Sequence, residues 1–71
     1  MTPQGFKEIR NELGLTQEAL SGIIGAHVVS ISKYESGKLF INPRLMFSMY
    51  YLRRVYEDGE WGSFLAKRKV K

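Results

Sequence analysis

The sequence predicts an all-α domain of four or five short helices, and three observations support this. Apolar residues recur every three or four positions in several runs, as they do on the buried face of a helix. Two of the runs follow a polar N-cap residue and a proline, at Thr2-Pro3 and Asn42-Pro43, and glycines end three of them. With 71 residues the chain makes one domain, near the length at which a single core needs support such as self-association.

The first helix is expected to begin at Pro3 and to end before Gly14. Phe6, Ile9 and Leu13 recur at helical spacing within this segment and form its buried face.

Two short helices are expected next, over about residues 17–24 and 28–36. Thr16 is a suitable cap for the first of them, and Gly25 ends it after about two turns. Gly37 is a suitable left-handed C-cap for the second. Two short helices joined by a glycine-containing turn of this length form a helix-turn-helix motif.

The fourth helix is expected from Pro43 to about Glu57. The stretch that follows predicts either a short fifth helix with a frayed end or an extended arm. We assign residues 1–66 to the helix-turn-helix domain and residues 67–71 to a basic C-terminal tail, which would add attraction to phosphates or be simply solvated.

The charge and composition indicate a polyanion as partner. The net charge is +4 and the pI is near 9.6, and the excess lies in residues 41–71, because acidic and basic side chains cancel in residues 1–40. The absence of cysteine excludes disulfides and thiolate zinc sites and favours a reducing, cytoplasmic compartment. No apolar run approaches the roughly 20 residues of a membrane span.

The helix over residues 28–36 is expected to present an exposed valine. If Ile31 marks the centre of its buried face, Val28 lies about 60° to one side at 100° per residue. Val29, Lys33 and Ser36 then lie on the opposite face. In a helix-turn-helix this face of the second helix enters the DNA major groove, where a valine methyl can contact thymine and a lysine can donate to guanine.

The segment FKEIRNELGLTQEALSGIIGAHVVSISKYESGK resembles the Cro/C1-type (XRE-family) DNA-binding domain of phage repressors. The residues LGLTQEAL and SISKYESGK and the later NPR carry most of the resemblance, which covers about residues 6–52. It implies a compact, lambda-repressor-like fold and double-stranded operator DNA as partner.

The resemblance also implies roles for individual residues. Gln17 would meet a DNA phosphate, Val28, Val29 and Lys33 would read bases, and Arg44 would reach the DNA backbone or the minor groove. The two valines then favour an operator that contains A·T pairs.

Other residues complete the candidate site. Arg10 and Glu35 match a structural ion pair between the first and third helices of the family. His27 replaces the usual serine or threonine cap, so its side chain is expected to be free to touch a phosphate or a base. Ser32, Ser36 and Lys38 would contact phosphates, although solvation or, for Lys38, the helix dipole explains them equally well.

The fourth helix is apolar on more sides than one thin domain can cover. We therefore expect a homodimer interface formed by this helix and the C-terminal segment. A core helix sealed by the C-terminal segment is the alternative. The expected interface residues are Tyr50, Tyr51, Val55, Trp61 and Phe64.

We expect no enzyme, because no motif joins the serines to His27 or to an acid, and no metal, cofactor or small-molecule ligand. The expected function is a homodimeric autorepressor on a palindromic operator, with half-sites about 34 Å apart. The alternatives are an antitoxin-like or adaptor module that binds a partner protein, and unspecific nucleic-acid packing through the basic tail.

Overall fold

The computed structural model describes the backbone of residues 1–69 and the side chains of residues 1–67. Within residues 1–69 the regular elements are all helices, which confirms the all-α prediction. Their bounds are α1 Pro3–Glu12, α2 Gln17–Ile24, α3 Val28–Ser36, α4 Pro43–Glu57 and α5 Trp61–Lys69.

Capping side chains explain where α1, α2 and α4 begin. The Thr2 hydroxyl accepts a hydrogen bond from the Gly5 amide at 2.9 Å, and Asn42 Oδ1 accepts one from the Leu45 amide at 2.9 Å. Thr16 caps α2 in the same way. Each bond satisfies an amide that has no partner within its helix.

The turn between α2 and α3 depends on Gly25, which has a φ of 73° and ends α2 in the left-handed conformation. A side chain at this position would be strained, because L-residues rarely adopt such a φ. The turn brings the end of α2 directly to His27, the residue before α3.

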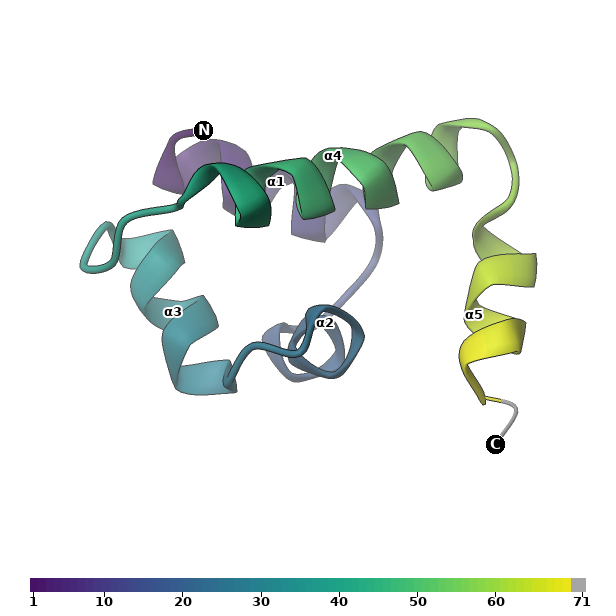
Figure 1. Ribbon diagram of the computed structural model, residues 1–71, viewed down its shortest axis with the longest axis horizontal. Helices are drawn as coiled ribbons and strands as arrows, with labels where there is room; N and C mark the ends of the chain where they lie inside the picture. The colour runs from purple at the N-terminus through teal and green to yellow at the C-terminus, as the bar shows by residue number, and fades with distance from the viewer. Residues whose placement is uncertain (70–71) are drawn as a thin grey trace.

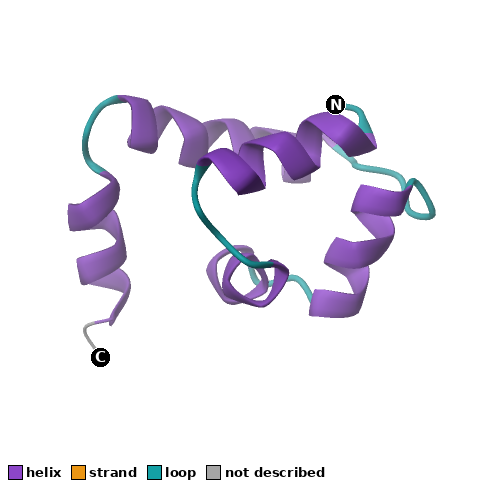
Figure 2. Ribbon diagram, turned by 180° about the vertical axis from the view of Figure 1, so that it is seen from behind, coloured by secondary structure: helices purple, strands orange, loops and turns teal. Residues whose placement is uncertain are grey.

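The first four helices enclose one core (Figures 1 and 2). α1 and α4 lie along one side of this core, and α2 and α3 close it from the other side. Buried apolar side chains from all four helices and from the α3–α4 loop meet there: Phe6, Ile9, Leu13, Leu20, Ile31, Ile41, Met49 and Leu52.

The C-terminal segment forms α5, so the helical alternative holds and residues 67–69 of the expected tail continue this helix. α5 follows the C-terminal end of α4 and lies at the opposite end of the molecule from α3 (Figure 1). Trp61 and Phe64 stack on each other within α5 at 5.4 Å. Two edge-on aromatic pairs attach them to α4: Tyr56 with Trp61, and Tyr51 with Phe64. The last residues of the expected tail, 70 and 71, lie outside the described residues. No helix in residues 1–69 has the length and apolar character to cross a membrane.

Candidate nucleic-acid interface

The outer face of α3 is arranged as its periodicity predicts. Ile31 is fully buried in the core, whereas Val29, on the opposite face, is 52% exposed. Lys33 and Ser36 are exposed beside it, and Val28 is half-buried at the edge of this face. An apolar group, a cation and a hydroxyl therefore point outward together from one rigid helix.

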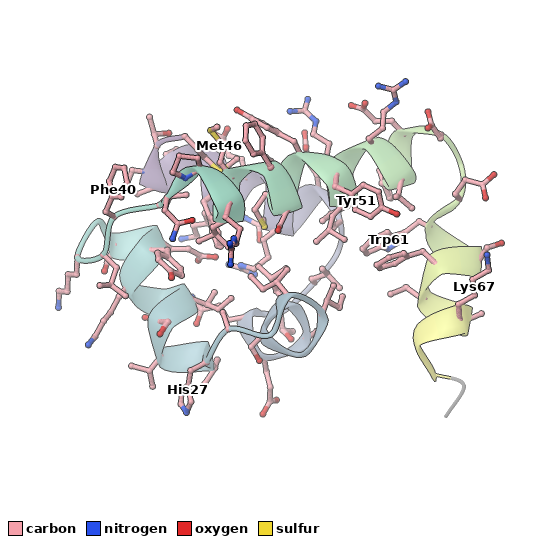
Figure 3. The ribbon with its side chains drawn as sticks, in the orientation of Figure 1. His27, Phe40, Met46, Tyr51, Trp61 and Lys67 are labelled. Carbon is pink, nitrogen blue, oxygen red and sulfur yellow. The ribbon has the colours of Figure 1, made fainter. Side chains whose placement is uncertain are left out.

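His27 differs from the expectation that its side chain is free. Its Nδ1 accepts a hydrogen bond from the Val29 amide at 3.2 Å, so the imidazole caps α3 in place of a hydroxyl. This bond requires a lone pair on Nδ1, so a neutral ring carries its proton on Nε2. The residue lies at the outer end of α3 (Figure 3), where the Nε2 N–H group can donate to a phosphate or a base.

A largely buried ion pair joins α1 to α3. Arg10 Nε and Nη2 donate to the two carboxylate oxygens of Glu35 at 2.6 and 3.1 Å, and Nη1 donates to the Leu15 carbonyl oxygen at 2.8 Å. The two side chains are only 11% and 6% exposed. Such two-bond geometry fixes the position of α3 on α1 more precisely than a single contact would.

Burial of Glu35 on its own would raise the pKa of the carboxyl group. Hydrogen bonds from Arg10 and Gln17, together with the charges of Arg10 and Lys7, outweigh this effect and lower the pKa below its ordinary value. Glu35 is therefore ionised at neutral pH and remains a partner for Arg10.

Gln17 belongs to the same network, which the sequence analysis did not foresee. Its Nε2 donates to Glu35 Oε1 at 3.0 Å, across a separation of 18 residues. One amide hydrogen is used in this bond, and the second stays available for a phosphate. The network thus orients Gln17 at the start of α2.

The cations of α3, of the residues just after it and of the first turn of α4 have no carboxylate partner among the described side chains: Lys33, Lys38 and Arg44. The other arginines with described side chains are all paired: Arg10 with Glu35, Arg53 with Glu12 and Glu57, and Arg54 with Asp58. Lys33, Lys38 and Arg44 lie on α3, just beyond its end and in the first turn of α4. Unpaired cations in one region are the arrangement that attracts a polyanion.

The α3–α4 loop exposes an aromatic residue that the sequence analysis did not select. Phe40 is 81% exposed, between Lys38 and Arg44 in the chain, and Leu39 beside it is also exposed. Figure 3 shows Phe40 at the outer edge of the molecule, near the start of α4. The sequence signal for this exposure is the loop KLFI, which has three consecutive apolar residues. Only Ile41 of the three is buried in the structure.

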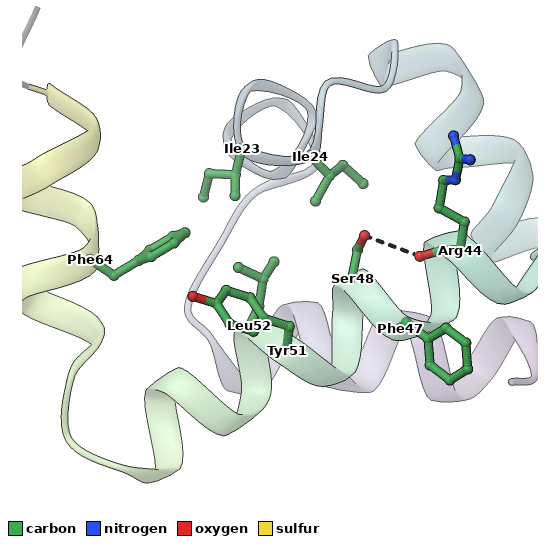
Figure 4. Close-up of a pocket in the computed structure, with 8 residues that line it drawn as sticks. All are labelled: Ile23, Ile24, Arg44, Phe47, Ser48, Tyr51, Leu52 and Phe64. Atoms are coloured by element: carbon green, nitrogen blue, oxygen red, sulfur yellow. Dashed lines mark hydrogen bonds between the residues drawn. The ribbon is translucent and has the colours of Figure 1, made fainter.

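A groove of about 750 Å³ lies between α2, α4 and α5 (Figure 4). Arg44 stands at one end of it and Phe64 at the other. Its lining is mostly apolar: Ile23, Ile24, Arg44, Phe47, Ser48, Tyr51, Leu52 and Phe64.

Four of the five residues expected at a dimer interface are neighbours. Tyr51, Val55 and Phe64 line one hollow between α4 and α5, and Trp61 is half-buried against Phe64 and the core. Tyr50 lies apart from them and borders α1 on another side of α4. Within the described residues, no three histidine, aspartate or glutamate side chains are grouped as metal ligands would be.

Comparison with known proteins gives one result. A family model described as helix-turn-helix matches residues 6–46, more than half of the chain, from α1 to the first turns of α4. No curated protein and no solved structure shows a significant match.

Proposed function

The chain belongs to the Cro/C1-type helix-turn-helix family of DNA-binding transcription regulators, and from this premise we propose that it is a repressor that binds a palindromic operator as a homodimer. The observation that carries the proposal is the outer face of α3, where Val29 is half exposed and Lys33 has no ion-pair partner among the described side chains. The second helix of this motif is the one that enters the major groove.

Base reading is assigned to Val28, Val29 and Lys33. The valine methyl groups would contact thymine methyl groups, and Lys33 would donate to guanine O6 and N7. Val28 is half-buried, so it would reach the base edges only from the side of the helix. The expected half-site therefore combines A·T pairs with a guanine.

Phosphate contacts are assigned to residues around this face. Gln17 would use its second amide hydrogen, His27 its Nε2 N–H group, and Lys38 and Arg44 their unpaired charges. Ser32 and Ser36, both exposed on α3, would donate from their hydroxyl groups. These contacts position the protein on DNA and supply much of the affinity, whereas the base contacts supply the specificity.

Two copies are needed because a palindromic operator presents two equal half-sites. Recognition helices about 34 Å apart would enter successive major grooves on the same side of the duplex. The exposed aromatic residues of α4 support self-association.

The test is fluorescence-anisotropy binding to the DNA upstream of the protein's own gene and to a scrambled duplex of equal length, each over a series of salt concentrations. A specific repressor should prefer the native DNA by roughly 10³-fold or more at physiological salt. Equal binding to both duplexes with the same steep salt dependence would contradict sequence-specific recognition at this site.

The groove favours a second function, in which the domain is an antitoxin-like or adaptor module that binds a partner protein. Its apolar lining is accessible from solvent and lies next to Arg44. The neighbouring genes distinguish the two functions. An antitoxin gene would lie beside a toxin gene, whereas an autorepressor gene would lie downstream of an inverted repeat.

A further inference from the structure

α4 has an exposed aromatic face that the other helices cover only in part, since α5 borders it beside Tyr51 and Val55. Phe47 and Tyr51 are 63% and 60% exposed, although each is large and apolar over most of its surface. They lie on the side of the helix away from Met49 and Leu52, which are buried in the core. Figure 4 shows Phe47 and Tyr51 on α4, with α2 and α5 along the edges of the groove.

The residues on this face are arranged symmetrically about Tyr51. Phe47 and Val55 are four positions before and after it, and Arg44 and Asp58 are seven positions before and after it. At 100° per residue all four lie within about 40° of Tyr51 around the helix. The face therefore carries a cation at one end, an anion at the other and apolar groups between them.

We propose that this face binds the same face of a second copy, with the two α4 helices antiparallel and the two-fold axis beside Tyr51. In this register Arg44 lies opposite Asp58 of the partner subunit, and Phe47 lies opposite Val55 of the partner subunit. A two-fold interface requires such self-complementarity, because each contact occurs twice. The proposal rests on the homodimer proposed above and specifies its surface and register.

The charges of α4 favour a second copy over other occupants. Arg44 has no carboxylate partner among the described side chains, and Asp58 is held only by an exposed pair with Arg54 at 3.4 Å. Exposed pairs of this kind are weak and can be exchanged. A cation in the first turn and an anion at the end both oppose the dipole of their own helix, and an antiparallel helix would compensate both.

Arg44 would then belong to both the dimer interface and the DNA-binding surface. Asp58 would belong to the dimer interface alone, since it lies at the opposite end of α4. Substitution of Asp58 is thus expected to weaken dimerisation and, through it, binding to a full operator, but not binding of one copy to a half-site.

A charge exchange tests the register. The dimer dissociation constant is measured by sedimentation equilibrium without DNA, for the full chain and for Arg44→Asp, Asp58→Arg and the double variant. Each single variant should raise this constant about tenfold, because two ion pairs become two repulsive contacts. The double variant should return it to within about threefold of the unchanged protein.

Glu57→Arg is the matched control. Glu57 is next to Asp58 and also pairs with an arginine one turn earlier, Arg53 at 3.2 Å, but it lies about 120° away from Tyr51 around the helix. Glu57→Arg should leave the dimer constant unchanged, and combining it with Arg44→Asp should restore nothing. Thermal melts followed by circular dichroism show whether each variant is folded.

A crosslink tests the axis independently, because the chain contains no cysteine. Tyr51→Cys places a thiol beside the axis, so mild oxidation should join two copies by a disulfide. Tyr50→Cys is the control, since this neighbouring exposed tyrosine lies about 100° away around α4.

The outcomes separate this inference from the proposed function. A dimer without rescue by the double variant and without the Tyr51→Cys crosslink would overturn this interface and leave the homodimer intact. A chain that stays monomeric at all concentrations, with and without operator DNA, would overturn both.

Discussion

The helix-turn-helix part of the molecule, α1–α3, and the C-terminal part, α4–α5, differ in how far their polar groups and apolar side chains find partners within one chain. In α1–α3 the largely buried ion pair of Arg10 and Glu35 is held by two hydrogen bonds, and in the described part of the chain no buried side-chain polar atom lacks a partner. On α4, in contrast, Phe47 and Tyr51 remain more than half exposed.

This difference indicates that the two parts have separate roles. The first part is rigid, so it can hold the exposed side chains of α3 in fixed positions, as the proposed DNA contacts require. The second part leaves an apolar face that water solvates poorly, so it favours association with another chain. Variants in the two parts should therefore affect different measurements.

The largest effect on stability is expected for Glu35→Ala, which removes the ion pair between α1 and α3. It leaves the Arg10 guanidinium buried without its charge partner, and such losses cost about 3 kcal/mol. Urea denaturation should show this decrease in the free energy of unfolding. Glu57→Ala, which removes an exposed pair with Arg53, should cost less than about 1 kcal/mol. Equal losses in the two variants would contradict the role of the buried pair.

Lys33→Ala should leave the fold intact and weaken operator binding by about 1–3 kcal/mol, as for the loss of one base contact. Binding to random DNA should change little. Anisotropy titrations on both duplexes measure the difference, and Lys38→Ala is the control, since loss of a phosphate contact should weaken both equally. If Lys33→Ala weakened binding to operator and to random DNA equally, Lys33 would contribute only electrostatic attraction and no base recognition.

Gly25→Ala should lower the free energy of unfolding by about 1–2 kcal/mol, because φ is 73° there and a Cβ strains the turn. Gly22→Ala is the control in the same helix, where an added Cβ meets no atom within 4 Å. It should stabilise the protein by up to about 1 kcal/mol through helix propensity. Thermal denaturation of both variants checks this, and a loss at both positions would contradict the assigned strain.

The smallest effect is expected for Phe47→Ser in the C-terminal part. At concentrations where the chain is monomeric, the free energy of unfolding should change by less than about 0.5 kcal/mol, because the ring is mostly in water. At higher concentrations the same variant should dimerise less than the unchanged protein. A large loss in the monomer would show that Phe47 stabilises the single chain.

Much of the fold could be predicted because it depends on local interactions. Thr16 and Asn42 accept hydrogen bonds from backbone amides three residues later in the chain. The left-handed φ of Gly25 belongs to a single residue at the end of α2. The exposure of Val29 opposite Ile31 follows from helix periodicity alone. Each of these features depends on residues within about one helical turn, so the sequence pattern contains them.

The expectation that the His27 side chain is free was wrong for a local reason of another kind. Serine and threonine are the usual caps, so a histidine at this position suggested a free side chain. Imidazole Nδ1 lies close enough to the backbone to accept the same bond, and His27 uses it for the Val29 amide. A substitution in the family pattern changed the chemical group and kept the geometry.

The amino-acid order was sufficient for the bounds of α1 to α4, the turn and the outward face of α3, since hydrogen bonds and side-chain spacing act over a few residues. Packing of distant segments settled the rest: the bond of Gln17 to Glu35, the groove beside Arg44, and the attachment of α5 through Trp61. These features depend on the angles and distances between helices, which the side chains of all the helices set together.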